Sequence, residues 1–316
     1  MKKLTEGRKM WISVMVIFAV YAVIFILFED YDRVHLEPFE ENSDWHLLLF
    51  SVVVMTGLAL LLHRYSRHMD ERISREQAEK ENRMRRELTQ NISHELKTPV
   101  ASILGYTDTI LNNPQMNDDT RQQFIRRTHA QAERLTALLQ DISMLNRMDY
   151  AADKLPMERV DISMLFADIV EETSLARQTK HITVNNCLPE DICIKGNWSL
   201  IYSIFRNLMD NAINYSGEGT TIEMDAQEES DRWTFIFSDN GVGVAEEHLP
   251  RIFERFYRID KGRSRSMGGT GLGLAIVKNA VLLHGGQIKV QKAAGKGLQF
   301  VFYLKKNFIA SGIKSD

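Results

Sequence analysis

Two long apolar runs near the N-terminus, residues 11–28 and 45–62, constrain the fold of this chain more than any other feature. The first run contains no charged residue, and about 18 residues at 1.5 Å each form a helix of roughly 27 Å, enough to cross the core of a bilayer. The second run is similar in length, and its polar residues His46, Ser51 and Thr56 are tolerated in a helix. We therefore predict two transmembrane helices. A cleaved signal peptide is the alternative for the first run, but the run is longer than usual and no small-x-small cleavage site follows it.

The charges that flank the two runs predict their orientation. Strong bases precede the first run and follow the second: Lys2, Lys3, Arg8, Lys9, Arg64 and Arg67. The connection, residues 29–44, is acidic and contains one strong base, Arg33. Because bases concentrate on the cytoplasmic side, residues 1–10 and the chain after residue 62 are predicted to be cytoplasmic. The connection is too short for a folded sensor domain. We interpret it as a solvated acidic turn, with a site for divalent cations or cationic peptides as the alternative.

The overall charge excludes one class of partner. The chain has 39 basic and 42 acidic side chains and a net charge of -3, so there is no electrostatic basis for direct nucleic-acid binding. Cys187 and Cys193 are the only cysteines in the sequence, and they lie in a stretch predicted to be cytoplasmic. Two reduced thiols provide neither a disulfide framework nor a zinc ligand set.

The chain after the second run is predicted to be helical up to residue 150. Residues 63–87 are rich in Arg and Glu without Pro or Gly, which favours one signalling helix, and residues 88–150 are predicted to form a helical hairpin. Apolar residues mark one face of its first helix: Leu88, Ile92, Leu96, Val100, Ile103, Leu104, Ile110 and Leu111. After a break at residues 112–114, Asp118 or Asp119 is predicted to cap the second helix. A lone hairpin leaves part of each stripe uncovered, so we expect a homodimer that closes a four-helix bundle.

The first helix of this hairpin carries the segment His-Glu-x-x-Thr-Pro, beginning at His94. Neutral imidazole is a good nucleophile, and an adjacent carboxylate can orient the ring and accept its proton, so His94 and Glu95 are candidate catalytic residues. Thr98 lies one turn further on the same face, where its hydroxyl could orient a water molecule. Pro99 removes one helix hydrogen bond and favours a bend. The alternative interpretation of His94 is a solvated surface side chain.

Residues 157–307 follow a short polar joint and are predicted to form an α/β domain. Helical periodicity covers residues 162–178 and 199–215, and strand-like runs cover residues 182–184 and 234–237. Alternating helices and strands predict a layered arrangement.

Two motifs of this domain predict ligand contacts. Asn207 and Asn211 lie one helical turn apart and can face the same pocket, where amide oxygens could bind Mg²⁺ together with phosphate oxygens. A polar helix face is the alternative. Asp239 ends a strand and can accept a hydrogen bond from an adenine amino group, and Gly241 and Gly243 let the backbone approach a ligand.

A second glycine-rich segment, residues 268–274, opens a predicted helix whose backbone N–H groups suit phosphates. It lacks the framing of a dinucleotide-binding fingerprint and the Lys-Ser/Thr of a P-loop. Residues 252–265 lie between the two glycine motifs and are predicted to form a lid whose cations suit a triphosphate: Arg255, Arg258, Lys261, Arg263 and Arg265.

In this order the segments resemble the H box and the N, G1, F and G2 boxes of the sensor histidine kinase family. The resemblance implies that His94 is phosphorylated, that Glu95 is the base and that Thr98 assists a phosphatase activity. It also implies that Asn211 binds Mg²⁺ and that Asp239 binds adenine. The other cofactor-binding residues that it implies are Asn207, Tyr215, Gly241, Gly243, Arg255, Arg258, Gly269, Thr270, Gly271, Leu272 and Gly273.

One position departs from the family pattern. Asn214 stands where the family commonly carries a lysine that reaches the phosphates. Weaker ATP affinity is therefore expected, unless Lys261 or Arg263 compensates.

The resemblance, with the apolar runs, predicts a multi-domain protein with two transmembrane helices, a dimeric helical-hairpin domain and an α/β sandwich ATP-binding domain. It implies an ATP-dependent protein-histidine kinase of the bacterial cell membrane, with both termini cytoplasmic and with ATP and Mg²⁺ as cofactors. The implied partners are a second copy of the chain, a cognate response regulator that receives the phosphoryl group on an aspartate, the lipid bilayer and a membrane or envelope sensory protein.

Two other functions share an ATP pocket of this kind. A receptor scaffold would bind ATP as a conformational switch without transferring phosphate, but the presence of His94, Glu95, Asn211 and Asp239 argues against it. An ATP-driven chaperone or DNA-repair clamp would have no use for the His94 helix or the membrane hairpin.

Overall fold

The computed structural model describes residues 26, 43–150, 155–259, 269–293 and 295–307. Apart from Ile26, the first predicted span (residues 11–28) lies outside these ranges, and so does most of the predicted connection (residues 29–44). The chain divides into two compact units, Met1–Glu87 and Leu88–Asp316.

Apart from Ile26, the described part of the first unit belongs to helix α2, which spans Ser43–Leu111 and continues into the second unit. The second predicted span, residues 45–62, and the predicted signalling helix, residues 63–87, both lie within α2. Apolar side chains are exposed on its early turns: Val52, Val53, Val54, Leu58, Leu60 and Leu61. Across the described ranges, no helix combines the length and the apolar character needed to cross a membrane.

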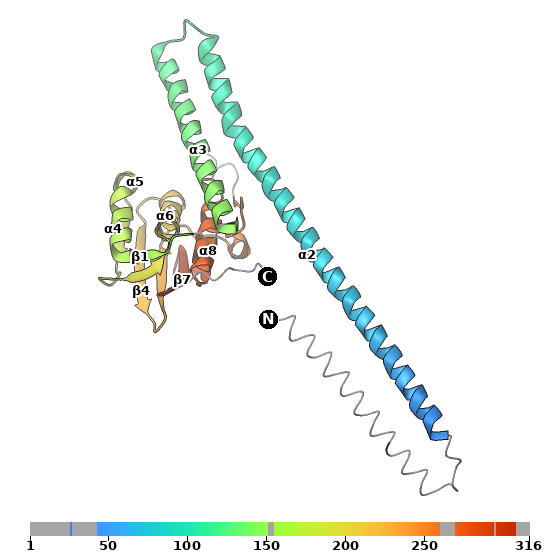
Figure 1. The fold of residues 1–316 in the computed structure, drawn as a ribbon. Helices are drawn as coiled ribbons and strands as arrows, with labels where there is room; N and C mark the ends of the chain where they lie inside the picture. The colour runs from blue at the N-terminus through green and yellow to red at the C-terminus, as the bar shows by residue number, and fades with distance from the viewer. Residues whose placement is uncertain (1–25, 27–42, 151–154, 260–268, 294, 308–316) are drawn as a thin grey trace. The chain divides into compact units, whose positions relative to one another are not determined.

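In the second unit, the last turns of α2 and helix α3 (Asp118–Tyr150) form a hairpin (Figure 1). The rings of Tyr106 and Phe124 lie 5.7 Å apart between the two helices. The side chain of Asn117 caps α3, because its Oδ1 accepts the N–H of Thr120 at 2.8 Å. The predicted cap, Asp118 or Asp119, was therefore wrong by one or two residues. The two aspartates lie in the first turn, where their charge favours the helix dipole.

The hairpin leaves part of its apolar surface exposed. Leu138, Leu145 and Met148 of α3 are buried within the second unit. Five large apolar side chains of the hairpin are between 41% and 74% exposed: Val100, Leu104, Leu111, Ile125 and Leu139.

The rest of the second unit is an α/β domain. Its main sheet has the strand order β2-β4-β5-β7-β6, in which β2 runs parallel to β4 and the other neighbours are antiparallel. A separate sheet pairs β1 with β3 in antiparallel fashion. The strands are β1 (Glu158–Asp161), β2 (Thr183–Asn186), β3 (Cys193–Gly196), β4 (Thr221–Glu228), β5 (Arg232–Asp239), β6 (Ile288–Lys292) and β7 (Leu298–Lys305). The helices are α4 (Ile162–Glu172), α5 (Ser174–Thr179), α6 (Trp198–Tyr215), the 3₁₀ helix η2 (Glu246–Arg251) and α8 (Gly273–Leu283).

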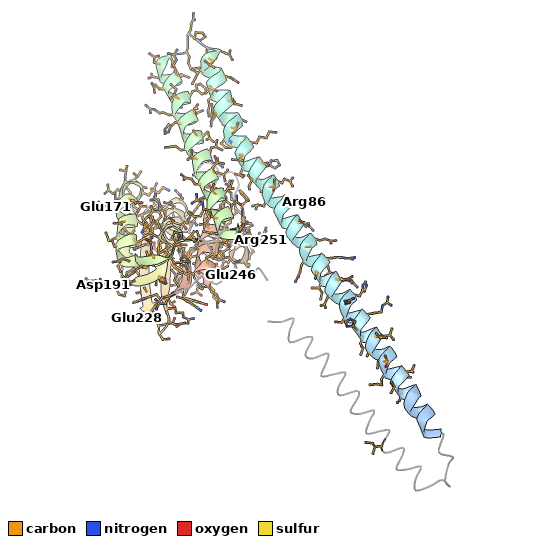
Figure 2. The ribbon with its side chains drawn as sticks, viewed as in Figure 1. Arg86, Glu171, Asp191, Glu228, Glu246 and Arg251 are labelled. Carbon is orange, nitrogen blue, oxygen red and sulfur yellow. The ribbon has the colours of Figure 1, made fainter. Side chains whose placement is uncertain are left out.

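One face of the main sheet is buried. Along β5, Trp233, Phe235, Phe237 and Asp239 are buried, and the residues between them are half-buried. This period of two is typical of a strand that packs on one side only. Buried residues of α4, α6 and α8 join the same core, while charged side chains such as Glu228 are exposed (Figure 2). The domain is therefore an α/β sandwich, which confirms the predicted fold.

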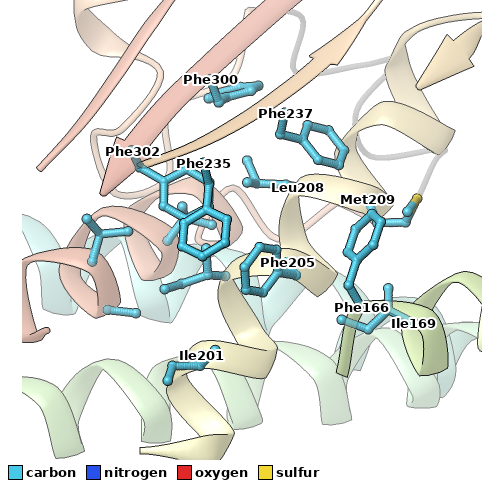
Figure 3. Packing of buried hydrophobic residues seen from close by; sticks show 14 of the residues in the cluster. Phe166, Ile169, Ile201, Phe205, Leu208, Met209, Phe235, Phe237, Phe300 and Phe302 are labelled. Carbon is cyan, nitrogen blue, oxygen red and sulfur yellow. The ribbon is translucent and has the colours of Figure 1, made fainter. Parts of the chain in front are cut away.

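Aromatic rings from both layers meet in this core (Figure 3). Phe205 of α6 lies with its ring centroid 5.5 Å from that of Phe235 on β5 and 5.8 Å from that of Phe302 on β7. The ring centroid of Phe166 on α4 lies 6.0 Å from that of Phe205. Such ring pairs add about 0.5–1.5 kcal/mol each beyond their burial. They fix α6 against the sheet, and α6 carries the asparagines of the predicted site.

The predicted helix of residues 162–178 is two helices, α4 and α5, separated at Thr173. The Thr173 hydroxyl donates to the carbonyl oxygen of Ile169 at 2.7 Å, and the Arg177 guanidinium donates to the carbonyl oxygen of Val170 at 2.7 Å. These bonds satisfy carbonyl groups at the end of α4. Helical periodicity alone does not reveal such a break, because the apolar spacing continues across it.

Candidate active site

Helix α6 presents two asparagines to a cavity. Asn207 and Asn211 lie one turn apart, as predicted, and both line this cavity. The Asn207 amide donates to the carbonyl oxygen of Ser203 at 2.8 Å. Its Oδ1 is therefore held beside the start of α8, where a Cβ added at Gly273 would lie 2.5 Å away. Only glycine leaves this asparagine in place.

Strand β5 ends in a buried carboxylate. Asp239 is 7% exposed, and its Oδ1 accepts the N–H of Gly241 at 2.9 Å. Burial raises the pKa of Asp239 above its ordinary value, and the backbone hydrogen bonds from Gly241 and Leu298 offset part of that rise. A Cβ at Gly241 would meet the carbonyl oxygen of Ser216. The backbone therefore packs closely around a carboxylate that can accept a hydrogen bond from an amino group.

The loop before α8 has the geometry of an anion-binding turn. Gly271 adopts a φ of +74°, which favours glycine. The Thr270 hydroxyl accepts the N–H of Leu272 at 3.2 Å, and the Gly271 carbonyl accepts the N–H of Phe256 at 2.8 Å. Helix α8 begins at Gly273, so its first N–H groups and positive dipole end border the loop.

The predicted lid is described as far as residue 259, and its two arginines have different partners. Arg258 donates from Nη2 to the carbonyl oxygen of Gly269 at 2.6 Å. Arg255 instead pairs with Asp149 of α3, with Nη2 to Oδ1 at 2.9 Å. The residues of the lid and loop that lie outside the described ranges include Lys261, Arg263 and Gly268.

These elements line a cavity of about 630 Å³, a volume typical of small-molecule sites. The predicted binding residues that line it are Asn207, Asn211, Tyr215, Asp239, Gly243, Arg258, Gly269, Thr270, Gly271 and Gly273. Asn214 lines it as well. Gly241 and Leu272 are buried beside the cavity and support its wall, and Arg255 is held by Asp149. The structure thus brings together residues from four separate sequence segments.

Sequence reasoning missed part of the lining. Apolar residues form much of the wall, among them Val244, Ile252 and Leu274. Ala137 and Asp141 reach the cavity from α3, outside the α/β domain. The apolar lining residues could have been predicted, because they lie next to the motifs in the sequence. Nothing in the sequence near Asp141 indicates a role at a nucleotide pocket.

The lining residues fit a nucleotide held together with Mg²⁺. Within the described ranges, no group of three or more His, Cys, Asp or Glu side chains converges to hold a metal ion by protein ligands alone. Magnesium accepts an amide oxygen when phosphates and water complete its coordination, and Asn211 offers such an oxygen. The glycine turn at residues 269–273 leaves the space that phosphates would need.

His94 lies elsewhere, on an exposed face of α2. It borders a shallow depression that is lined by His94, Lys97, Thr98, Ala101 and Ser102. The Thr98 hydroxyl lies 3.4 Å from the carbonyl oxygen of His94 and donates to it. Among the described residues that line the nucleotide cavity, neither His94 nor Thr98 occurs. The predicted phosphoacceptor and the predicted nucleotide site are therefore separate in this arrangement.

Comparison with known proteins accounts for both sites. Residues 84–151 match the His Kinase A (phospho-acceptor) domain, and residues 196–307 match the Histidine kinase-, DNA gyrase B-, and HSP90-like ATPase family. The chain is 31% identical over 301 residues to a sensor protein kinase WalK of Staphylococcus aureus, a match that covers 89% of this chain and 70% of that protein. The chain belongs to the sensor histidine kinase family.

Other sensor histidine kinases match over a smaller share of their length. The match to WalK of Staphylococcus aureus strain MRSA252 covers 48% of that protein, and the sensor-like histidine kinase SenX3 of Mycolicibacterium smegmatis is 33% identical over 217 residues, 68% of this chain and 56% of SenX3. The chain thus spans about half the length of these curated relatives. The structure of ShkA in complex with AMPPNP has a TM-score of 0.51 and 28% identity, and the match covers 67% of this chain and 44% of ShkA.

In this sensor histidine kinase, the residue after the predicted phosphoacceptor is held by two arginines. The Glu95 Oε2 atom lies 3.1 Å from Nη2 of Arg258 and 3.6 Å from Nη2 of Arg134 on α3. The Glu95 side chain is 16% exposed, so these charges are screened only in part. The two guanidinium groups compete with His94 for the carboxylate that was predicted to act as its base.

Proposed function

We propose that this sensor histidine kinase uses ATP to phosphorylate its own His94 and then passes the phosphoryl group to an aspartate of a response regulator. The observation that carries the proposal is the cavity formed by α6, the end of β5, the lid and the loop before α8, in a chain that also exposes a histidine on a helical hairpin. The AMPPNP bound to the related ShkA supports ATP as the ligand of this cavity.

Different residues of the chain have separate roles in phosphoryl transfer. ATP supplies the γ-phosphoryl group, and Asn211 would hold Mg²⁺ against its phosphates. A ring nitrogen of neutral His94 attacks the γ-phosphorus, a nitrogen–phosphorus bond forms, and the bond to the ADP oxygen breaks. Glu95 accepts the proton that the imidazole loses. The backbone N–H groups of residues 269–273 hold the phosphates as charge moves to the leaving oxygen.

This reaction requires a different arrangement from the one described. His94 does not line the described nucleotide cavity, and Glu95 is paired with Arg134 and Arg258. The hairpin and the α/β domain must therefore separate, which releases Glu95 from Arg258, and Glu95 must also exchange Arg134 of the same hairpin for His94. The second copy of a dimer could bring its own nucleotide cavity to His94 in the same way.

We also propose a phosphatase activity assisted by Thr98. Its hydroxyl donates to the carbonyl oxygen of His94, and Thr98 lines the same depression as Ala101 and Ser102, where a response regulator would dock. Thr98→Ala should slow removal of phosphate from the regulator while labelling of His94 remains. Equal dephosphorylation rates for the variant and the unmodified chain would rule this role out.

Dimerisation and membrane insertion are further parts of the proposal. The exposed Val100, Leu104 and Leu139 suit a hairpin that packs against a second copy, which light scattering of the full-length chain would detect as a dimer.

The uncharged residues 11–28 and 45–62 support two spans in the bacterial cell membrane with both termini cytoplasmic. Recovery of the chain in the soluble fraction after an alkaline wash of membranes would contradict insertion.

The direct test is incubation of the purified full-length chain with γ-labelled ATP and Mg²⁺. The wild type should acquire an acid-labile and alkali-stable label, and His94→Gln should acquire none. His129→Gln is a matched control, because His129 is an exposed histidine on α3, and its labelling should equal that of the wild type. If the chain binds ATP but none of the three proteins is labelled, the kinase proposal fails and a receptor scaffold that uses ATP as a switch replaces it.

A further inference from the structure

Asp141 brings a carboxylate of α3 to the cavity of the α/β domain. The Thr270 hydroxyl donates to Asp141 Oδ2 at 2.7 Å, and both residues line the cavity. Ala137, one turn earlier on α3, lines it too. The hairpin is therefore a wall of the nucleotide cavity in this arrangement, and it contacts the loop proposed to hold phosphates.

The charge of this wall is unfavourable for phosphates. The described structure shows no ion pair between Asp141 and a lysine or arginine, and its partner is the neutral hydroxyl of Thr270. Burial raises the pKa of Asp141 above its ordinary value, and the hydrogen bond from Thr270 lowers it in part. This direction is expected for a carboxylate that is withdrawn from water without a neighbouring cation.

We propose that Asp141 is a selectivity residue that makes the docked hairpin favour a nucleotide with fewer phosphates. The inference rests on the proposed function, because it takes residues 269–273 as the phosphate loop. The Asp141 carboxylate, which contacts that loop from α3, repels each added phosphate charge at short range and in a partly buried place. Its effect therefore increases from adenosine, which has no phosphate, through ADP to ATP.

This selectivity couples the nucleotide to the position of the hairpin. ATP binding disfavours the docked arrangement, in which Arg258 of the α/β domain holds Glu95. After the γ-phosphoryl group has left, the remaining diphosphate is repelled less and the hairpin can dock again. A ligand shifts such an equilibrium only by its difference in affinity for the two arrangements, and Asp141 provides that difference.

The test compares nucleotide affinities of the full-length wild type and Asp141→Asn. Asparagine keeps an oxygen that can accept the Thr270 hydrogen bond and removes the charge. Dissociation constants for ATP, ADP and adenosine are measured by calorimetry, with Mg²⁺ and again with EDTA. ATP affinity should increase about threefold or more, ADP affinity should increase less, and adenosine affinity should not change. The increase should be larger in EDTA, because Mg²⁺ neutralises part of the phosphate charge.

Two further variants make the result specific. Asp119→Asn removes the same charge from an exposed position in the first turn of α3 and should leave all three affinities unchanged. Ala137→Asp adds a second carboxylate to the cavity wall and should weaken ATP binding more than adenosine binding. This variant keeps the inference testable if Asp141→Asn does not fold.

The outcomes separate this inference from the proposed function. Equal increases for all three ligands, no change, or weaker ATP binding by Asp141→Asn would each overturn the role of Asp141. Weaker binding only with Mg²⁺ would identify Asp141 as a metal ligand instead. A wild-type chain that binds none of the three ligands would overturn the proposed function, and the inference with it.

Discussion

Arg258 of the lid lies 3.1 Å from Glu95, measured from its guanidinium Nη2 to the carboxylate Oε2, although the two residues are far apart in the sequence. The same nitrogen donates to the carbonyl oxygen of Gly269 at 2.6 Å. The Arg258 and Glu95 side chains are 6% and 16% exposed, so this is not an ordinary surface ion pair. One guanidinium thus connects the residue beside His94 to the loop proposed to hold phosphates.

Arg258→Lys should loosen this connection. The lysine side chain is shorter than that of arginine and lacks the planar guanidinium, so its ammonium does not reach the point from which Nη2 contacts both Glu95 and the Gly269 carbonyl. Loss of one charged hydrogen bond should lower the free energy of local opening by about 1.5–3 kcal/mol, which raises the population of the open form roughly tenfold or more. Hydrogen–deuterium exchange at residues 269–273 of the nucleotide-free chain should therefore become about tenfold faster.

The control for this measurement is Arg251→Lys. Arg251, which is labelled in Figure 2, pairs with Glu254 at 3.2 Å, but both side chains are more than half exposed. Exchange at residues 269–273 should remain as in the wild type. Equal acceleration in both variants would mean that Arg258 acts only through general loosening of the lid.

Gly241→Ala should destabilise the α/β domain rather than only weaken ligand binding. An added Cβ would meet the carbonyl oxygen, Cα and Cβ of Ser216, and the backbone cannot move away as the end of a flexible side chain can. Overpacking of this kind lowers the free energy of unfolding by about 1–3 kcal/mol. For a unit of this size the melting temperature should fall by roughly 2–12 °C.

Gly105→Ala is the matched substitution in open space. A Cβ at Gly105, inside α2, meets no atom within 4 Å. Alanine in a helix interior is favoured over glycine by about 0.5–1 kcal/mol, so this variant should melt at the wild-type temperature or slightly above it. A Gly241→Ala protein as stable as the wild type would show that residue 241 is not packed as described.

Most of the binding residues predicted from sequence line the nucleotide cavity, because they belong to short motifs whose residues lie close together in the chain. Asn207 and Asn211 share a helix face by their spacing, and Gly271 stands where the backbone adopts a positive φ. The sandwich fold was predictable for the same reason, since the periodicity of β5 and α6 already separates buried from exposed faces.

The contacts between the hairpin and the α/β domain were not predictable. Asp141 meets Thr270, and Glu95 meets Arg258, across long stretches of sequence that carry no shared pattern. Their pairing depends on how two folded parts dock, and local propensity contains no information on docking. The cap at Asn117 was missed for a smaller reason, because three neighbouring residues can all cap a helix and the backbone geometry selects one of them.

His284 should make the stability of the domain depend on pH. It is 1% exposed, its Nδ1 lies 2.7 Å from the carbonyl oxygen of Ala280, and its Nε2 accepts the N–H of Asn197 at 3.0 Å. Both bonds are satisfied by a neutral ring with the proton on Nδ1. Burial lowers the pKa of His284 below its ordinary value of 6.5, and the hydrogen bond to Ala280 offsets part of that effect.

The sign of the pH effect follows from this lowered pKa. The unfolded chain takes up a proton at His284 more readily than the folded chain, so the stabilisation is complete above pH 6.5 and is lost as the pH falls toward the folded pKa. The loss approaches but does not exceed about 1.4 kcal/mol per pH unit. Urea unfolding of His284→Gln at pH 7.5 and 5.5 should show a smaller difference between the two pH values than the wild type. His129→Gln, on the exposed face of α3, should behave as the wild type does, and an unchanged pH dependence in His284→Gln would contradict the assignment.

Asn214→Lys should tighten nucleotide binding. Asn214 lines the cavity one turn after Asp210 on α6, at the position where the resemblance to the family's motifs implies a lysine. An ammonium near the phosphates is worth about 1 kcal/mol in a partly exposed site, so ATP affinity should increase about fivefold and adenosine affinity should not change. Calorimetry with both ligands measures this, and Asn146→Lys, at an exposed position of α3, is the control for added charge.

The result also distinguishes two ways to supply the missing cation. If Asn214→Lys tightens ATP binding, the wild type lacks a cation at this point of the cavity. If it does not, while Lys261→Gln or Arg263→Gln weakens ATP binding, the lid already supplies that charge. When Asp141→Asn is combined with Asn214→Lys, the two gains in ATP binding free energy should add, because two charges that do not contact each other contribute independently. A combined gain that departs from the sum would mean that the side chains at positions 141 and 214 interact directly.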